Sequence, residues 1–211
     1  MVGKGRLEAF SDGVIAIIIT IMVLELRAPT GSDWDALSPL VPEFAAYILS
    51  FVYLAIYWNN HHYLIHSTQH VTAPILWANT HLLFWLSLVP FVTGWLGHHP
   101  FEAVPTAAYG TVMVFAGAAY WILQQAIIAA VGRDSRVAHA IGNDAKGLAS
   151  IGLYAAAIAL AFVYPAASAA IYAGVALLWL VPDRRLRAVH QVERLQDTSA
   201  ATFEVRSAKS K

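Results

Sequence analysis

Ionisable side chains stand close together at the start of the first apolar stretch of the chain. Arg6, Glu8 and Asp12 precede or enter a run of aliphatic residues that continues to Leu24. If this stretch is a helix, Asp12 lies about 9 Å beyond Arg6 along the helix axis. A carboxylate buried at that depth needs hydrogen-bonding partners. Such groups are costly inside an apolar helix, so they indicate either a functional site or a structural hydrogen-bond network between helices.

Partners for Asp12 can come from two later apolar stretches. Polar residues end one stretch and begin the next: Trp58, Asn59, Asn60, His61 and His62, then Trp77, Asn79 and His81. Counting about 1.5 Å per residue from each helix end places Asp12, His62 and Asn79 at similar depth. We therefore predict a buried polar layer that joins the first three helices. It either supplies interhelical hydrogen bonds alone or acts as the hinge that positions the first helix.

The nine histidines raise the question of a metal site. His62 and His66 have the i, i+4 spacing that places two imidazoles on one helix face, but no third ligand of matching character is apparent. The sequence contains no nucleophile elbow, paired carboxylates or glycine-rich phosphate loop. It also contains no cysteine, which excludes thiol catalysis and thiolate metal sites. We therefore predict that the protein is not an enzyme, and we predict no metal or cofactor.

The elements that must position these side chains are transmembrane helices. Of the 211 residues, 58% are hydrophobic and only 12% are charged, whereas an ordinary soluble domain carries about a quarter charged residues. Three long segments contain no Asp, Glu, Lys or Arg: residues 44–101, 103–132 and 147–182. Since a helix needs about 20 apolar residues to cross a bilayer, these segments accommodate two, one and two spans. The first apolar stretch adds a sixth.

Proline residues help to delimit the six helices. The expected ranges are 6–26, 42–66, 73–96, 106–131, 148–164 and 166–181. Pro90 should bend the third helix. We predict an all-α polytopic membrane protein whose residues 1–182 form a six-helix transmembrane domain. Residues 183–211 are expected to form a cytoplasmic C-terminal helix and tail.

Basic residues indicate the orientation in the membrane. With six spans, both termini and the loops after the second and fourth spans share one side. That side holds twelve of the thirteen Lys and Arg residues, and only Arg27 lies on the other. Positive charges near helix ends are retained in the cytoplasm, so both termini are predicted to be cytoplasmic. The formal net charge of zero gives no indication of a nucleic-acid partner.

One face of the first helix is aliphatic. On a helical wheel, the residues within about 60° of Ile17 are Gly13, Thr20, Ile21 and Leu24. Ser11 and Asp12 point away from this face. The pattern alone does not decide whether the face contacts lipid, packs in a core or has a function.

The first helix begins with a motif that resembles the signature of the transmembrane protein 175 family, whose bacterial members are potassium channels. The matching residues are Arg6, Phe10, Ser11, Asp12 and Gly13, continuing through Ala16 and Thr20 to Leu24, Glu25 and Leu26. Two later segments are similar to that family in order and spacing: Trp58 with Asn60, His61 and His62, and Asn79 with Pro90 and Phe91. The resemblance covers nearly the whole chain.

The resemblance implies a homotetramer in the bacterial plasma membrane, in which four copies of the first helix line a central potassium-permeable pore. It also implies a hydrophobic constriction in place of a carbonyl filter, formed by Ile17, Thr20, Ile21 and Leu24. The signature motif and interhelical network then comprise Arg6, Phe10, Ser11, Asp12, His61, His62 and Asn79. The expected partners are potassium ions, the lipid bilayer and further copies of the chain. Two alternatives remain: a proton-coupled transporter that uses the Asp, His and Asn layer, and a non-conducting membrane scaffold.

Overall fold

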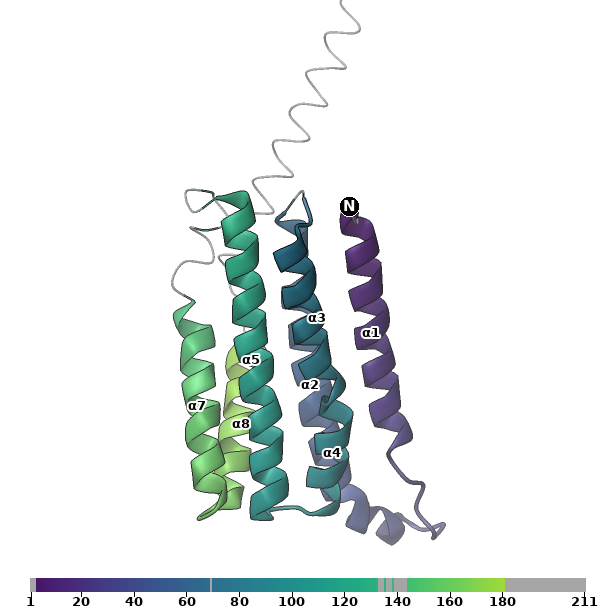
Figure 1. Cartoon of the computed structure of the whole chain (residues 1–211). Helices are drawn as coiled ribbons and strands as arrows, with labels where there is room; N and C mark the ends of the chain where they lie inside the picture. The colour runs from purple at the N-terminus through teal and green to yellow at the C-terminus, as the bar shows by residue number, and fades with distance from the viewer. Residues whose placement is uncertain (1–2, 69, 133–134, 136–137, 139–143, 181–211) are drawn as a thin grey trace, which may run out of the picture.

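The structure is a bundle of roughly parallel and antiparallel helical rods (Figure 1). This computed structural model describes residues 3–68, 70–132, 135, 138 and 144–180. Its α-helices are α1 (Lys4–Leu24), α2 (Val41–His66), α3 (Ala73–Ser87), α4 (Val89–His98), α5 (Ala103–Val131), α7 (Ala145–Ala161) and α8 (Pro165–Leu180), and the 3-10 helix η1 (Trp34–Leu40) leads into α2. With α3 and α4 taken as one interrupted rod, these residues form six rods. The all-α prediction is confirmed, whereas the predicted C-terminal helix and tail lie outside the described residues.

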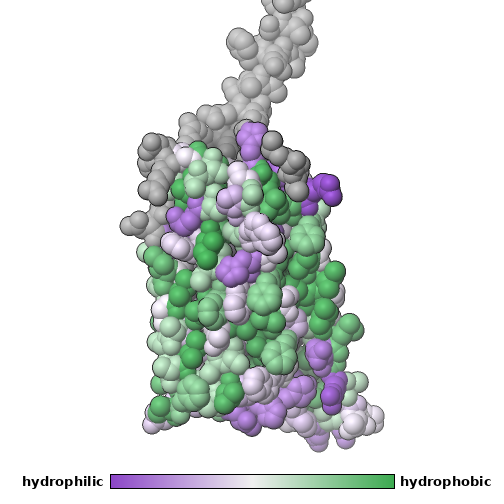
Figure 2. Space-filling view, in the orientation of Figure 1, coloured by the Kyte–Doolittle hydropathy of each residue, from purple (hydrophilic) through white to green (hydrophobic). Residues whose placement is uncertain are grey.

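The helices have the length and composition of membrane spans. Four segments are long and apolar enough to cross a bilayer: Lys4–Leu24, Trp34–His66, Ala73–His98 and Ala103–Val131. The remaining helices, α7 and α8, are apolar but have only 17 and 16 residues. At about 1.5 Å per residue they are somewhat shorter than the hydrocarbon core of about 30 Å. Figure 2 shows hydrophobic side chains over most of the flank of the bundle, as expected of an integral membrane protein.

The third rod is interrupted close to Pro90. Helix α3 ends at Ser87, and α4 begins at Val89 with Pro90 in its first turn. Proline has no N–H to donate to the carbonyl four residues earlier, and its ring crowds that carbonyl. The side chain of Thr93 occupies another backbone acceptor nearby, because its Oγ1 donates to the Val89 carbonyl at 2.7 Å. The bend expected at Pro90 thus takes the form of a break between two helices.

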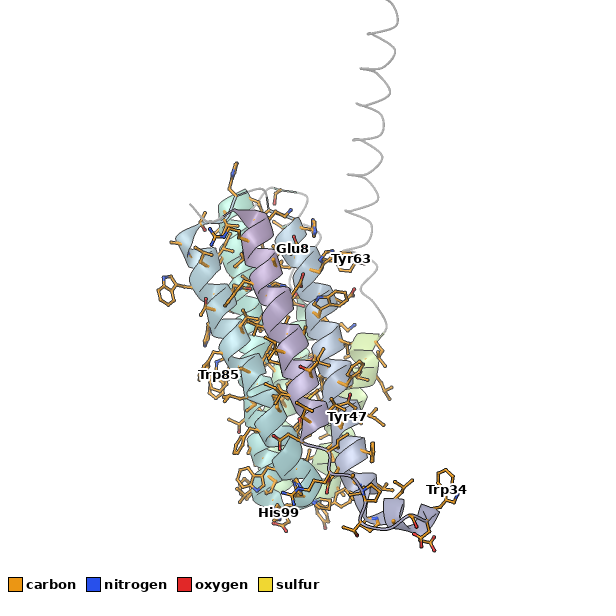
Figure 3. The ribbon with its side chains drawn as sticks, turned by 90° about the vertical axis from the view of Figure 1, so that its right-hand side faces the viewer. Glu8, Trp34, Tyr47, Tyr63, Trp85 and His99 are labelled. Atoms are coloured by element: carbon orange, nitrogen blue, oxygen red, sulfur yellow. The ribbon has the colours of Figure 1, made fainter. Side chains whose placement is uncertain are left out.

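One face of α1 packs against the bundle. Its buried residues recur every three or four positions: Leu7, Ser11, Ile15, Ile18 and Met22. This periodicity gives a helix one continuous buried stripe. The stripe contacts α2, α3 and α4, so α1 lies at the edge of the bundle with its other face uncovered (Figure 3).

A glycine on α5 permits a close approach of α8. Tyr172 from α8 is fully buried, and its hydroxyl donates to the Thr106 carbonyl at 3.0 Å. A Cβ added at Gly110 would collide with the Tyr172 hydroxyl and lie only 2.8 Å from Ile158 Cγ1. The small residue therefore sets the distance between α5 and its neighbours, as in many membrane helix contacts.

We expect Gly110→Ala to lower the stability of the bundle. Overpacking a filled interior costs about 1–3 kcal/mol, and here Tyr172 must also shift away from its carbonyl partner. The measurement is the thermal melting temperature of the purified protein in detergent. Gly152→Ala on α7 is the matched control, since a Cβ there meets nothing within 4 Å. Equal melting temperatures for both variants would contradict the packing argument.

Candidate functional site

Three polar side chains from three helices meet inside the bundle. Ser11 on α1, His61 on α2 and Asn79 on α3 are each 0% exposed. Asn79 Nδ2 donates to Ser11 Oγ at 2.9 Å, and His61 Nε2 donates to Asn79 Oδ1 at 2.7 Å. Ser11 Oγ in turn donates to the Leu7 carbonyl at 2.9 Å. This buried triad (Ser11, His61 and Asn79) fixes the rotation of α1 against α2 and α3.

Asp12 bonds to Trp58, one of the polar residues proposed as its partners, and not to His62 or Asn79, which were placed at its depth. The indole Nε1 of Trp58 donates to Asp12 Oδ1 at 3.0 Å. Successive residues of a helix point about 100° apart, so Ser11 faces the interior while Asp12 turns toward α2 at the bundle surface. Asp12 is therefore half-buried, and Ser11 contacts the interior Asn79 in its place.

His62 is paired with Glu8, one turn before Asp12 on α1. Glu8 Oε1 lies 3.0 Å from His62 Nδ1 and 2.8 Å from His66 Nε2. Sequence reasoning considered Glu8 and His66 separately and did not pair them. The signal was present, because Glu8 is four residues before Asp12 and so shares its helix face, and His62 is four residues after Trp58.

Arg6 and Phe10 lie outside these contacts. Both are exposed, Phe10 to 59%, and among the described residues neither hydrogen-bonds to the triad. Lys4, two residues before Arg6, instead makes an interhelical contact at this end of α1. Its Nζ donates to the His66 carbonyl at 2.8 Å, which ties the beginning of α1 to the end of α2.

The aliphatic residues of α1 form an uncovered outer stripe, which we define as Ile17, Thr20, Ile21 and Leu24. Ile17 is 58% exposed, Ile21 42% and Leu24 81%. Thr20 is exposed as well, and its hydroxyl donates to the Ile17 carbonyl at 2.8 Å. The stripe carries no ionisable group, and it can therefore contact an ion only weakly. No other helix of the described chain covers it, as Figure 3 shows with α1 in front of the bundle.

A second buried polar cluster was not anticipated from the sequence. Thr93 Oγ1 lies 2.7 Å from Ser50 Oγ, and Ser50 Oγ lies 3.1 Å from the Tyr109 hydroxyl. These residues come from α4, α2 and α5. Hydroxyl side chains recur along α2 and α5, and Ser and Thr within helices commonly bond to the backbone of their own helix. No sequence pattern therefore distinguished them.

The chain is similar to known channel proteins. The family described as "Endosomal/lysosomal potassium channel TMEM175" matches residues 6–90, the segment that contains the triad and the outer stripe. A Chryseobacterium protein named as a potassium channel is 52% identical over 183 residues, covering 87% of this chain and 95% of that protein. The human protein named "Endosomal/lysosomal proton channel TMEM175" is 34% identical over 99 residues, 41% of this chain and 20% of its own length.

A solved structure shares the fold. The crystal structure of a lysosomal potassium-selective channel TMEM175 homolog from Chamaesiphon minutus superposes with a TM-score of 0.73 at 27% identity, covering 85% of this chain and 97% of that one. Potassium channels are not enzymes, so the expectation of a non-enzyme is confirmed. Since more than half of the aligned residues are identical to the Chryseobacterium channel over almost its full length, this chain belongs to the TMEM175 family of potassium channels.

Proposed function

We propose that four copies of the chain assemble into a potassium-permeable channel whose central pore is lined by α1. The observation that carries this proposal is the uncovered outer stripe of α1, which faces away from the helices that bury the opposite side. One helix supplies a single wall and cannot enclose a pore. Several copies arranged around an axis would place the outer stripes opposite one another, as closed cyclic symmetry requires.

In this assembly the pore narrows at Ile17, Thr20, Ile21 and Leu24. An ion that crosses a ring of aliphatic side chains must lose or thin its hydration shell. That costs less for a large, weakly hydrated cation than for sodium, so the constriction selects potassium modestly. A small rotation of α1 would narrow the ring and close it by dewetting.

The groove beside the outer stripe is a surface against which a neighbouring copy of the chain could pack. It lies between α1 and α4, and Ile17, Ile21, Phe91 and Trp95 are among its lining residues. Phe91, in the first turn of α4, is 66% exposed although it is a large aromatic residue. A second α1 packed into this groove would cover Phe91 and join the two outer stripes.

The buried triad and the Asp12–Trp58 bond serve as the support of α1. They hold its N-terminal half against α2 and α3, whereas the part beyond Asp12 packs mainly through apolar side chains, among them Ile15 and Ile18. The polar layer therefore sets the angle at which the outer stripe meets the pore.

Potassium flux into liposomes tests the proposal. A channel passes potassium down a voltage without a second gradient, and a transporter requires its coupled ion. A scaffold does neither. The reconstituted protein should show voltage-driven potassium flux that persists when the proton gradient is abolished. Flux that disappears with the proton gradient would favour the proton-coupled transporter instead.

Proton permeation is a second candidate activity of the same pore. The specific observation in its favour is the human relative, which is named a proton channel. A pH-sensitive dye inside the same liposomes measures it. If a potassium diffusion potential acidifies the interior of the liposomes, the pore also conducts protons.

We propose that the protein lies in the bacterial plasma membrane with both termini in the cytoplasm. Lys4 and Lys146 belong to helix ends at one end of the bundle, and Arg27 follows α1 at the other. The chain has no cysteine, so single cysteines report topology cleanly. A membrane-impermeant maleimide added to whole cells should label Ser32→Cys and not Thr72→Cys, and the reverse result would invert the orientation.

A further inference from the structure

We propose that Glu8, His62 and His66 form a binding site for a divalent transition-metal ion of the zinc class. The ligand atoms of the three side chains lie within 4.8 Å of one another. Both imidazoles contact the same carboxylate oxygen, Glu8 Oε1, at 3.0 and 2.8 Å. Figure 3 shows Glu8 near the N-terminal end of α1, beside the end of α2 that carries Tyr63.

The donor set matches zinc in type. Two imidazole nitrogens with one carboxylate oxygen form a recurrent three-ligand set for Zn²⁺. Calcium and magnesium instead prefer oxygen ligands alone. The i, i+4 spacing already placed His62 and His66 on one face of α2, and their ring centroids are 4.5 Å apart. Glu8 on α1 supplies the third ligand that was not apparent from the sequence.

The geometry requires only a small adjustment. Metal–ligand bonds of about 2.0–2.1 Å in a tetrahedral site place the ligand atoms about 3.3–3.4 Å apart. Each imidazole would move away from Glu8 Oε1 by a few tenths of an ångström, and the two imidazole nitrogens, which lie within 4.8 Å of one another, would also have to come to this separation. The exposed fractions of the His62 and His66 side chains are 41% and 40%, so both rings have room to move. An ion would take the place of the direct contacts between the two imidazole nitrogens and the carboxylate oxygen.

The site is open on one side. Three protein ligands and partly exposed imidazoles leave the fourth position to water, as in exchangeable rather than closed structural zinc sites. Two further charges lie close by. Asp12 is one helical turn from Glu8 and adds negative charge, whereas Lys4 is held at the His66 carbonyl, 2.8 Å from its Nζ. The carboxylate of Glu8 is only 19% exposed, which strengthens its attraction for a bound cation.

A bound ion would tie α1 to α2. Because α1 would then be fixed at its N-terminal end, we expect the ion to restrict rotation of α1 and to reduce flux. The effect on flux rests on the proposed function, in which α1 lines the pore. Binding of the ion does not depend on that function.

Binding is measured on the full chain in detergent. Zn²⁺ should raise the melting temperature of the wild type, and Co²⁺ should give the absorption of a four-coordinate site with one ion per chain. Glu8→Gln and His66→Ala should each weaken affinity by more than about 100-fold, since even partners outside the ligand shell cost about 10- to 100-fold. Mg²⁺ and Ca²⁺ should have no effect.

His99→Ala is the matched control. It removes an exposed histidine that contacts a single carboxylate, Glu102, at 3.2 Å, and His99 lies at the opposite end of the bundle from Glu8 (Figure 3). This variant should bind Zn²⁺ as the wild type does. No saturable binding to the wild type, or equal binding to Glu8→Gln and His66→Ala, would show an adventitious ion only and overturn the proposal. Melting of each variant without metal checks its folding, and His66→Ala is expected to fold because His66 is partly exposed at the end of α2.

The flux assay separates this proposal from the proposed function. Zn²⁺ should reduce flux through the wild type and His99→Ala but not through Glu8→Gln. If Zn²⁺ binds and the wild type shows no potassium flux, the metal site stands and the channel proposal fails. If potassium flux occurs and Zn²⁺ does not bind, the metal site fails alone.

Discussion

Replacing Ile17 or Leu24 with serine is expected to increase potassium flux and to reduce the preference for potassium over sodium. In a homotetramer each substitution removes four aliphatic side chains from one ring, and the smaller hydroxymethyl groups leave space for a hydrated ion. Leu24 is 81% exposed and Ile17 58%, so neither change removes buried packing within the chain. Single-channel conductance and the reversal potential under potassium and sodium gradients measure the effect.

Two variants control for indirect effects. Ile17→Val keeps an aliphatic ring of similar width and should conduct as the wild type does. Asp12→Ala removes the acceptor of the Trp58 indole at a half-buried position, so it should cost about 0.5–1.5 kcal/mol of stability and leave selectivity unchanged. Unaltered permeation in both serine variants would place the constriction elsewhere. A changed reversal potential in Asp12→Ala with normal melting would mean that α1 is rotated, with the carboxylate facing the pore.

The fold could be predicted because lipid imposes a simple rule on composition. Segments 44–101, 103–132 and 147–182 lack charge altogether, and backbone groups inside a bilayer must be satisfied within helices. The predicted boundaries of α2 and α5 agree with the structure within about three residues. The break before Val89 was expected only as a bend, because a proline shows where a helix is weakened but not whether neighbouring contacts keep the rod continuous.

The polar contacts were less predictable, since depth along a helix and direction around it are separate quantities. Counting residues placed Asp12, His62 and Asn79 at one depth. Counting residues does not give the rotation of α1 about its axis. That rotation directs Ser11 to Asn79 and Asp12 to Trp58. Glu8 was not paired with His62 for the same reason, although both residues were noted in the sequence.

The sequence and the structure agree on the outer stripe of α1. A helical wheel grouped Ile17, Thr20, Ile21 and Leu24 on one face, and the structure leaves that face without a covering helix among the described residues. Neither observation reveals what lies opposite the face. A second copy of the chain is not encoded in any local pattern, so the sequence of one helix could not predict the pore.

Asn79→Ala is expected to cause the largest loss of stability among polar substitutions in the bundle. Asn79 is 0% exposed and is the only member of the triad that contacts both others, so alanine leaves Ser11 Oγ and His61 Nε2 without their interhelical partner. Hydrogen bonds between membrane helices are worth about 0.6 kcal/mol on average and up to about 1.7. Loss of two such bonds therefore costs about 1–3 kcal/mol, and α1 loses its polar contact with α3.

The measurement is thermal melting together with size-exclusion chromatography of Asn79→Ala. Thr80→Ala is the matched control, because Thr80 is the next residue of α3, is exposed, and donates only to the Leu76 carbonyl of its own helix. If the triad positions α1, the melting temperature of Asn79→Ala falls, its assembly is impaired, and any protein that does assemble shows altered gating with unchanged ion preference. A melting temperature equal to that of Thr80→Ala would mean that apolar packing of Leu7, Ile15 and Ile18 alone holds α1 in place.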